Sequence, residues 1–264
     1  MIEITKSFGK HTVLSSACAE IEPCRLYLIV GENGSGKTTL FKTLNGLIRR
    51  FEGTTGGKKY ILVEDTPAFF KTRSGDDNLR YFLNKEEYLR SRKYVQDFHM
   101  EDYIDTKFKT YSQGMRKKLA VVLGLSKNAD VLLLDEPSNG LDRNSVFTLH
   151  SVLKEYKKEK TVIVASHDAS FFDPELVDRI LVLKDRKIEE YRDDLFDYSY
   201  YFVRTKNELT ADAAMIARRP GPDSYVVKVM PGEEDKAAAS LIPFGLLEYR
   251  KLDYADSFYS ENLL

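Results

Sequence analysis

Residues 31–38 read Gly31-Glu32-Asn33-Gly34-Ser35-Gly36-Lys37-Thr38, which fits the pattern G-x-x-x-x-G-K-[ST] of a phosphate-binding loop. The glycines of such a loop let several backbone N–H groups converge on phosphate oxygens at the positive end of the following helix. At this spacing Lys37 reaches the β- and γ-phosphates, and the Thr38 hydroxyl ligates Mg²⁺. The stretch therefore predicts a site for a nucleoside triphosphate with Mg²⁺.

The segments on either side of the loop occur in the order that this motif requires. The apolar run Leu26–Val30 predicts a buried strand immediately before the loop. The pattern of Thr39–Leu44 predicts a helix immediately after it, ending near Gly46. Because strand, loop and helix follow one another, we interpret the loop as functional and not as a chance glycine-rich turn.

Length and composition allow one large α/β domain with a small appendage. The chain has 264 residues, 42% of them hydrophobic and 31% charged. No apolar run approaches the roughly 20 residues of a membrane-spanning helix. The formal net charge is −1, so charge does not indicate nucleic acid as the main partner, and none is expected.

The N-terminal residues and the cysteines predict a cytosolic, reduced protein. Met1–Lys6 lacks the basic-then-apolar character of a signal peptide. Cys18 and Cys24 have a spacing that suits neither a zinc site nor a redox pair. We expect both to be small, buried apolar side chains.

Two carboxylates follow a second apolar run. Val131–Leu134 predicts a fully buried strand, and Asp135 and Glu136 come directly after it. In an open α/β sheet the carboxyl ends of the strands form the ligand-binding edge. At that edge Asp135 would hold Mg²⁺, and Glu136 would polarise the attacking water.

A histidine follows a third predicted strand. Thr161–Ala165 is apolar, and His167 comes two residues after it. A lone histidine is more often structural than catalytic, but this one would share the sheet edge with Glu136. Strands that alternate with helices predict a mostly parallel sheet with right-handed crossovers.

The region from Pro67 to about Leu125 has helical spacing and predicts a helical subdomain inserted into the α/β core, with mostly solvated charges. Within it, Ser112 is a good N-cap. Ser112 and Gly114 at the start of a helix could bind an anion, but without further evidence this pair is only a weak indication of such a site. Near the N-terminus, Phe8 could stack on a base or belong to the core, and both readings stay open.

Together these residues resemble the ATP-binding subunit of an ABC (ATP-binding cassette) transporter. The order of motifs matches from Phe8 to about Ile188, through the Walker A loop 31–38, the signature-like Ser112-Gln113-Gly114, Walker B 131–136, the turn 139–142 and His167. Many enzymes share a P-loop, so a signature sequence at this spacing before Walker B identifies the family more specifically than the P-loop alone. The resemblance implies a P-loop NTPase fold and an ATPase.

The resemblance also implies partners. In that family Ser112 and Gly114 would bind the γ-phosphate held by the Walker A loop of a second subunit, so the active unit would be an ATP-driven homodimer or a heterodimer with a homologous subunit. Asp142 would lie in the loop that crosses the dimer interface, and His167 would contact the γ-phosphate. Permease subunits on separate chains would hold the protein on the cytoplasmic face of the membrane.

Two positions depart from the family pattern. The signature carries Gln113 where a glycine is commoner. Where most members carry a glutamine that touches Mg²⁺ or water, this chain has Glu64 or Asp65, and we favour Glu64. A glutamate there resembles exporters that protect cells against antimicrobial peptides, which favours export.

Two other classes of protein remain as alternatives. A non-transport ABC ATPase acting on DNA would carry a long coiled coil, and one acting on ribosomes would carry two cassettes. An unrelated P-loop kinase or GTPase would not need Ser112-Gln113-Gly114, Glu136 and His167 together.

We expect residues 1–190 to form the ATP-binding domain, with the helical subdomain at about 67–125. From about Asp197 the family pattern fades, and the residues themselves predict a small α+β appendage at 197–264 after an acidic linker at 189–194. In the appendage we expect strands at 199–205, 224–230 and 246–252, and helices at 209–217, 233–239 and the last ten residues.

The expected site residues form three groups. Those expected to bind nucleotide are Phe8, Asn33, Gly34, Ser35, Gly36, Lys37, Thr38, Thr39, Ser112 and Gly114. The expected catalytic residues are Glu136 and His167, and the expected Mg²⁺ ligands are Thr38, Glu64 and Asp135. Phe69 and Phe70 could pin the helical subdomain to the core, or one of them could line a groove for a permease helix.

Overall fold

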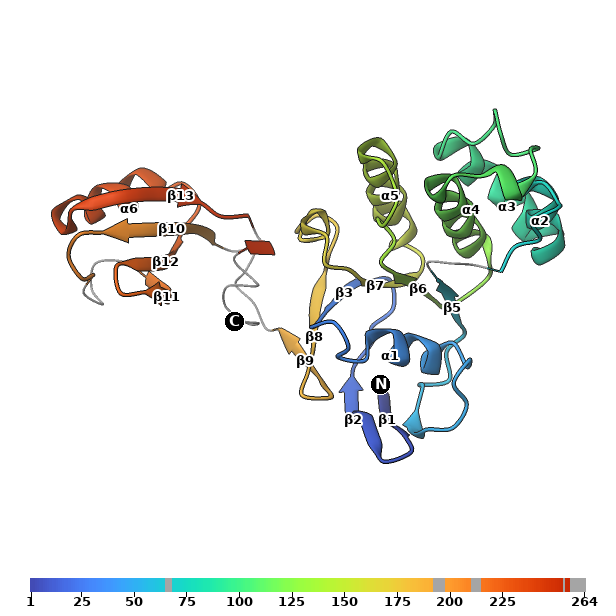
Figure 1. Ribbon diagram of the computed structural model, residues 1–264, viewed down its shortest axis with the longest axis horizontal. Helices are drawn as coiled ribbons and strands as arrows, with labels where there is room; N and C mark the ends of the chain where they lie inside the picture. The colour runs from blue at the N-terminus through green and yellow to red at the C-terminus, as the bar shows by residue number, and fades with distance from the viewer. Residues whose placement is uncertain (65–67, 192–197, 210–214, 254, 257–264) are drawn as a thin grey trace. The chain divides into compact units, whose positions relative to one another are not determined.

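The computed structural model describes residues 1–64, 68–191, 198–209, 215–253 and 255–256 (Figure 1). The chain divides into two compact units. The first contains Met1–His167 and Glu175–Tyr191, and the second contains Asp168–Pro174 and Arg192–Leu264. Each unit is described by itself.

The first unit is built on a six-stranded sheet in the order β5-β6-β7-β3-β8-β9. All neighbouring strands are parallel except β9, which runs antiparallel to β8. Every residue of the central strands β3 and β7 is buried, as expected for a parallel sheet covered on both faces. The strands are β5 (Tyr60–Val63), β6 (Val131–Asp135), β7 (Thr161–Ala165), β3 (Leu26–Val30), β8 (Arg179–Lys184) and β9 (Lys187–Tyr191). The predicted α/β fold with a mostly parallel sheet is confirmed.

A smaller antiparallel sheet, β2-β1-β4, covers the helix that follows the phosphate-binding loop. Its strands are β1 (Ile2–Phe8), β2 (His11–Ala19) and β4 (Glu52–Thr54), and the helix is α1 (Lys37–Leu44). Ile4, Leu14 and Phe41 are fully buried in one cluster with residues of the large sheet. In β4, Gly53 has φ +108°, and a Cβ there would lie 2.0 Å from the Glu3 carbonyl oxygen. Only glycine at position 53 therefore allows β4 to pair this closely with β1.

Three helices form a separate layer at one end of the first unit (Figure 1). They are α2 (Gly75–Phe82), α3 (Lys85–Asp97) and α4 (Gln113–Ser126), with a 3₁₀ turn, η1 (Phe108–Thr110). Capping boxes start α2 at Ser74 and α3 at Asn84. A further helix, α5 (Arg143–Tyr156), lies between β6 and β7 in the chain. The three helices α2, α3 and α4 therefore occur within the region 67–125, where the helical spacing predicted a helical subdomain.

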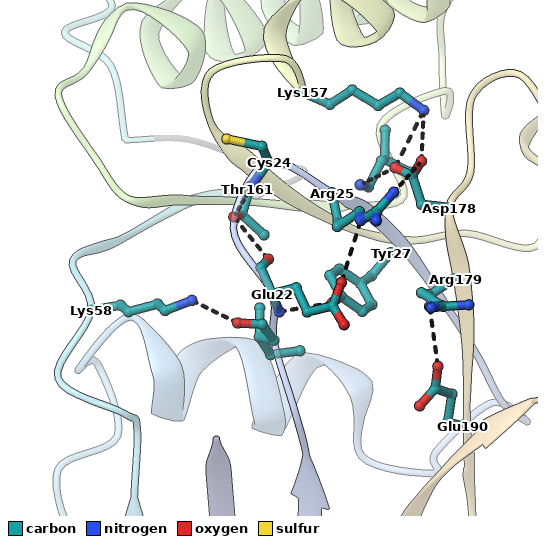
Figure 2. A network of polar contacts seen from close by, with 12 residues as sticks. Glu22, Cys24, Arg25, Tyr27, Lys58, Lys157, Thr161, Asp178, Arg179 and Glu190 are labelled. Carbon is teal, nitrogen blue, oxygen red and sulfur yellow. Dashed lines mark hydrogen bonds and ion pairs between the residues drawn. The ribbon is translucent and has the colours of Figure 1, made fainter.

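A polar network fixes the beginning of β3 (Figure 2). The Asp178 carboxylate accepts a hydrogen bond from the Leu26 N–H at 2.7 Å and forms an ion pair with Lys157 at 3.3 Å. The Thr161 hydroxyl accepts from the Cys24 N–H at 3.1 Å, and the Tyr27 hydroxyl accepts from a backbone N–H at 2.8 Å. These bonds tie together strands that are distant in sequence before the chain reaches the phosphate-binding loop.

The second unit contains an antiparallel sheet in the order β11-β12-β10-β13. Alternate residues of its strands, such as Tyr201, Val203, Tyr225 and Val227, form one cluster with Leu241 of the helix. The elements are β10 (Ser199–Thr205), β11 (Met215–Gly221), β12 (Ser224–Val229), α6 (Glu234–Leu241), η3 (Ile242–Phe244) and β13 (Leu246–Lys251). A further 3₁₀ turn, η2 (Ala169–Phe171), belongs to the segment Asp168–Pro174 of this unit.

Two predicted elements near the C-terminus are wrong. Met215–Ala217 was expected at the end of a helix but pairs with β12, where Ile216 faces Val227, because strand pairing outweighs local helix propensity. Glu189 and Glu190 were expected in a linker but lie in the edge strand β9, where exposed charges are well tolerated. Parts of the predicted helix 209–217, the acidic linker and the C-terminal helix lie outside the described residues.

The prediction of buried cysteines is also wrong, since both side chains are exposed. Cys18 lies between the buried residues Ala17 and Ala19 in β2, so the alternation of the strand turns it outward. Cys24 lies in a turn with φ +56°. Among the described residues, no helix has both the length and the apolar character needed to cross a membrane.

Candidate functional site

The phosphate-binding loop connects β3 to α1 and needs its glycines for backbone geometry. Gly34 has φ +85° and Gly36 has φ +112°, a region that other residues rarely adopt. Gly36 is the N-cap of α1 and offers no side chain to the first N–H groups of the helix. These donors and the helix dipole are therefore directed at any anion that enters the loop.

Two side chains of the loop are placed for a phosphate. Lys37 is only 9% exposed, and its Nζ donates to the carbonyl oxygens of Gly31 at 2.6 Å and Glu32 at 3.1 Å. Burial lowers the pKa of Lys37, and the carboxylates of Glu136 and Asp135 act in the opposite direction. The buried Ser35 hydroxyl has no hydrogen-bond partner within the part of the chain that the structure describes. A buried polar atom of this kind fits a ligand that brings an acceptor.

The loop meets the end of β6 through a side-chain hydrogen bond. The Thr38 hydroxyl donates to the Asp135 carboxylate at 2.9 Å. These two oxygens suit Mg²⁺, which takes few protein ligands and completes its coordination with phosphates and water. The described residues contain no cluster of three or more His, Cys, Asp or Glu side chains that could hold a metal ion.

Glu136 and His167 meet at the same edge of the sheet. The Glu136 N–H donates to the Ala165 carbonyl at 2.8 Å, which continues the pairing of β6 with β7 beyond the strand. The His167 N–H donates to the Glu136 carboxylate at 3.4 Å, and the His167 Nε2 lies 3.7 Å from the other carboxylate oxygen. Glu136 has φ +45°, an unusual conformation for a non-glycine residue that often marks a functional site. The sharing of one edge by these two residues is as the sequence predicted.

Ser112 and Gly114 lie at the start of α4, against the turn that follows Walker B. The Ser112 hydroxyl accepts from the Met115 N–H at 3.2 Å, as expected for an N-cap. A Cβ added to Gly114 would lie 2.8 Å from the Gly140 carbonyl oxygen, so no larger residue fits without movement of the turn. Asp142 ends this turn and caps α5, and hydrogen bonds from the Ser145 N–H and hydroxyl lower its pKa.

The remaining predicted site residues lie at the surface. Phe8 is 51% exposed at the end of β1, and the Lys6 ammonium lies 4.5 Å from its ring centroid. Glu64, expected to ligate Mg²⁺, forms an ion pair with Lys42 of α1 at 3.3 Å. The alternative residue, Asp65, lies outside the described residues.

Sequence reasoning missed one residue of this region. Lys117 belongs to the basic run Arg116-Lys117-Lys118, where charges were expected to be solvated, yet Lys117 is only 2% exposed. Its Nζ donates to the Asp135 carbonyl oxygen at 3.3 Å. The basic run itself contains no local signal that distinguishes the buried lysine from its neighbours.

Three comparisons with known proteins agree with this geometry. The family model described as ABC transporter matches residues 14–139. An uncharacterized ABC transporter ATP-binding protein of Methanocaldococcus jannaschii is 32% identical over 197 residues, 71% of this chain and 74% of that protein. The chain belongs to the ABC transporter ATP-binding proteins.

Other members of the ABC family are also similar to the chain. The lantibiotic transport ATP-binding protein SrtF of Streptococcus pyogenes is 28% identical, covering 62% of this chain and 77% of that protein. A solved ATP-binding subunit of an ABC transporter has the same fold, with a TM-score of 0.65 and 20% identity over 74% of this chain and 91% of that one. As an ABC ATP-binding subunit, the chain binds and hydrolyses ATP and has a membrane permease as its partner, as the sequence predicted.

Proposed function

We propose that this ABC ATPase subunit hydrolyses ATP with Mg²⁺ at the sheet edge formed by Thr38, Asp135, Glu136 and His167, and that hydrolysis powers export. The observation that carries the proposal is the convergence of the phosphate-binding loop, two carboxylates and a histidine at one edge. The loop follows β3, both carboxylates lie at the end of β6, and the histidine follows β7, so the group exists only in the folded chain.

Each residue has a distinct role. The Lys37 ammonium and the N–H groups of the loop bind the phosphates. Thr38 and Asp135 would hold Mg²⁺, which neutralises phosphate charge when bound, with Glu64 as a further candidate ligand. Glu136 orients the attacking water and accepts its proton, and His167 positions the Glu136 carboxylate and faces the γ-phosphate. Phe8 stacks on the base, since its ring is exposed.

A second subunit completes each site. Gly114 lies against Gly140 in the turn 138–142 of its own chain, and Ser112, the N-cap of α4, is exposed. We infer that they bind the γ-phosphate held by the partner's loop, in a homodimer or a heterodimer with a homologous subunit. The N-terminus of α4 favours an anion at that position.

The permease docks at an aromatic surface defined by Phe70, which precedes α2, and Tyr81 of α2. Phe70 is 41% and Tyr81 66% exposed, and their ring centroids lie 4.7 Å apart. Phe69, by contrast, is buried, with its ring 5.0 Å from Phe108. Exposed aromatic side chains are typical anchors at protein interfaces. Docking would place the protein on the cytoplasmic face of the membrane, and the similarity to SrtF favours export.

Substitution of Glu136 tests the catalytic assignment. Glu136→Gln keeps the shape of the side chain but removes the base, so we expect ATPase activity to fall by about 10²–10⁴-fold. ATP affinity should be retained, and an ATP-bound dimer should accumulate in gel filtration. As a control, Lys37→Ala should weaken ATP binding itself. Turnover at the wild-type rate in Glu136→Gln would show that the base lies elsewhere.

A pair of neighbouring aromatic residues tests the docking surface. Phe70→Ala should reduce recovery of the subunit with membranes that contain the permease, with little change in melting temperature. Phe69→Ala is the matched control, because truncating a buried Phe costs about 3–5 kcal/mol of stability. Unchanged membrane recovery of Phe70→Ala would exclude this docking surface while leaving the ATPase assignment intact.

A further inference from the structure

A cleft of about 1050 Å³ lies between α3 and α5 in the first unit. Its walls come from α3, from Asn128 after the end of α4, and from α5 with the residues that follow it. The described residues that line it include none of those assigned above to nucleotide, Mg²⁺ or the permease. Small-molecule sites have volumes of roughly 300–1,000 Å³, so the cleft is large enough for a ligand of that size.

Two tyrosines in the lining of the cleft have hydroxyl groups that the protein leaves unsatisfied. Tyr94 of α3 is only 8% exposed, and Tyr156 is the last residue of α5. Among the described residues, neither hydroxyl has a hydrogen-bond partner. The hydroxyl of a buried tyrosine usually finds such a partner. A ligand that brings an acceptor into the cleft would supply it.

Both hydroxyls are protonated donors at neutral pH, and a guanidinium lies near them. Burial raises the pKa of Tyr156, with a further contribution from Tyr94, whereas Arg90 acts in the opposite direction. Burial also raises the pKa of Tyr94, again opposed by Arg90. Within the described chain, Arg90 donates one hydrogen bond, to the Ser126 carbonyl oxygen at 3.1 Å, which leaves most of its N–H groups for a ligand.

The charges that line the cleft favour an anion. Three cations in the lining form no ion pair with the residues that the structure describes: Arg90, Lys93 and Lys160. Of the carboxylates in the lining, Glu155 is neutralised by Lys158 at 2.7 Å, and Asp97 and Glu159 remain. Three cations and two carboxylates outside ion pairs leave a net charge of +1. A ligand with one negative charge would complement it.

An exposed aromatic side chain completes the lining. Phe147 of α5 is 57% exposed, and with the rings of Tyr94 and Tyr156 it offers apolar surface to a ligand. We propose that the cleft between α3 and α5 binds a small aromatic ligand that carries one anionic group. The aromatic part packs against these rings, and the anionic group accepts hydrogen bonds from the two tyrosine hydroxyls and from Arg90.

A fluorescent aromatic anion tests the cleft in the full chain. The probe is 8-anilinonaphthalene-1-sulfonate, which carries one negative charge and becomes more fluorescent in an apolar environment. We expect saturable binding that an excess of ATP with Mg²⁺ does not displace, because the cleft is separate from the nucleotide site. N-phenyl-1-naphthylamine has the same rings without the sulfonate. It should bind at least about tenfold more weakly, since it cannot accept the charge-assisted hydrogen bonds.

Single substitutions locate the bound probe. Tyr94→Phe removes one hydroxyl that has no partner among the described residues, so it should keep the wild-type melting temperature and bind the sulfonate about tenfold or more weakly. Arg90→Gln removes the cation and should weaken binding of the sulfonate at least as much. Tyr81→Phe is the matched control, because it makes the same chemical change at an exposed tyrosine of α2 outside the cleft. It should keep the wild-type affinity.

Four results would overturn the inference. They are no saturable binding of the sulfonate, its displacement by ATP, equal affinity for the uncharged analogue, and wild-type affinity in both Tyr94→Phe and Arg90→Gln. Displacement by ATP would place the probe in the nucleotide site, and equal affinity for the analogue would show that the anionic group is not recognised. None of these results bears on hydrolysis at Glu136, so the proposed function stands or falls separately.

Discussion

Asp178 is the acceptor that holds the first residue of β3, and its removal should loosen that strand. Its carboxylate lies 2.7 Å from the Leu26 nitrogen, 3.3 Å from the Lys157 ammonium and 3.7 Å from the Arg25 guanidinium (Figure 2). The Asp178 side chain is 20% exposed, so water replaces these contacts only in part. The perturbation we consider is Asp178→Ala.

The magnitude follows from what each partner loses. The Leu26 N–H becomes a buried donor without its acceptor, which costs about 1–3 kcal/mol. Lys157 keeps the carbonyl oxygens of Leu176 at 2.8 Å and Glu175 at 3.2 Å, so the loss of its ion pair adds only about 0–1 kcal/mol. The two ranges add to about 1–4 kcal/mol, and we expect a value in the middle of that range, roughly 2–3 kcal/mol. Asp178→Asn keeps an acceptor oxygen and should cost less than about 1 kcal/mol.

Hydrogen exchange measures this effect locally. The chain has two compact units, so a single global unfolding curve would not be two-state, whereas exchange reports on each segment. In Asp178→Ala, the amides of Leu26–Val30 should exchange on the order of 30- to 100-fold faster, since 1.4 kcal/mol corresponds to about tenfold. Asp178→Asn should stay close to wild type. Wild-type protection of Leu26 in Asp178→Ala would refute the reasoning.

Two further predictions concern a buried tyrosine and the signature glycine. Burial raises the pKa of Tyr60 from 10.0 to about 12, with a smaller contribution from Asp130. The protonated form is therefore favoured in the folded state, and stability that is present below about pH 10 is lost as the pH rises toward 12. Tyr60→Phe should reduce that alkaline loss by up to roughly 2.7 kcal/mol. Urea unfolding of the first unit, followed separately from that of the second across this pH range, measures the effect, and an equally steep loss would contradict the assignment. Gly114→Ala places a Cβ 2.8 Å from the Gly140 carbonyl, so it should cost about 1–3 kcal/mol and lower ATPase activity with ATP affinity retained, whereas wild-type turnover would show that the turn adapts freely.

Much of the first unit could be predicted because its signals are local. The order of strand, glycine loop and helix around Lys37 needs no information from distant residues, since the φ values of Gly34 and Gly36, +85° and +112°, are readily adopted by glycine and rarely by other residues. The apolar run before Asp135 likewise identifies a buried strand by composition alone. Because the strands are parallel, their carboxyl ends share one edge of the sheet. The proximity of Glu136 and His167 could therefore be predicted from the sequence.

The tertiary structure decided which side chains are buried and which segments pair. Lys117 has the same local sequence context as its exposed neighbour Arg116, and its ammonium finds the Asp135 carbonyl oxygen as a partner because the fold brings the end of β6 beside α4. Met215–Ala217 becomes a strand because β12 supplies its hydrogen-bond partners. Cys18 is exposed because the strand register turns it outward. Local patterns determine backbone geometry, whereas burial and pairing depend on residues far away in the chain, whose positions are set only when the whole fold forms.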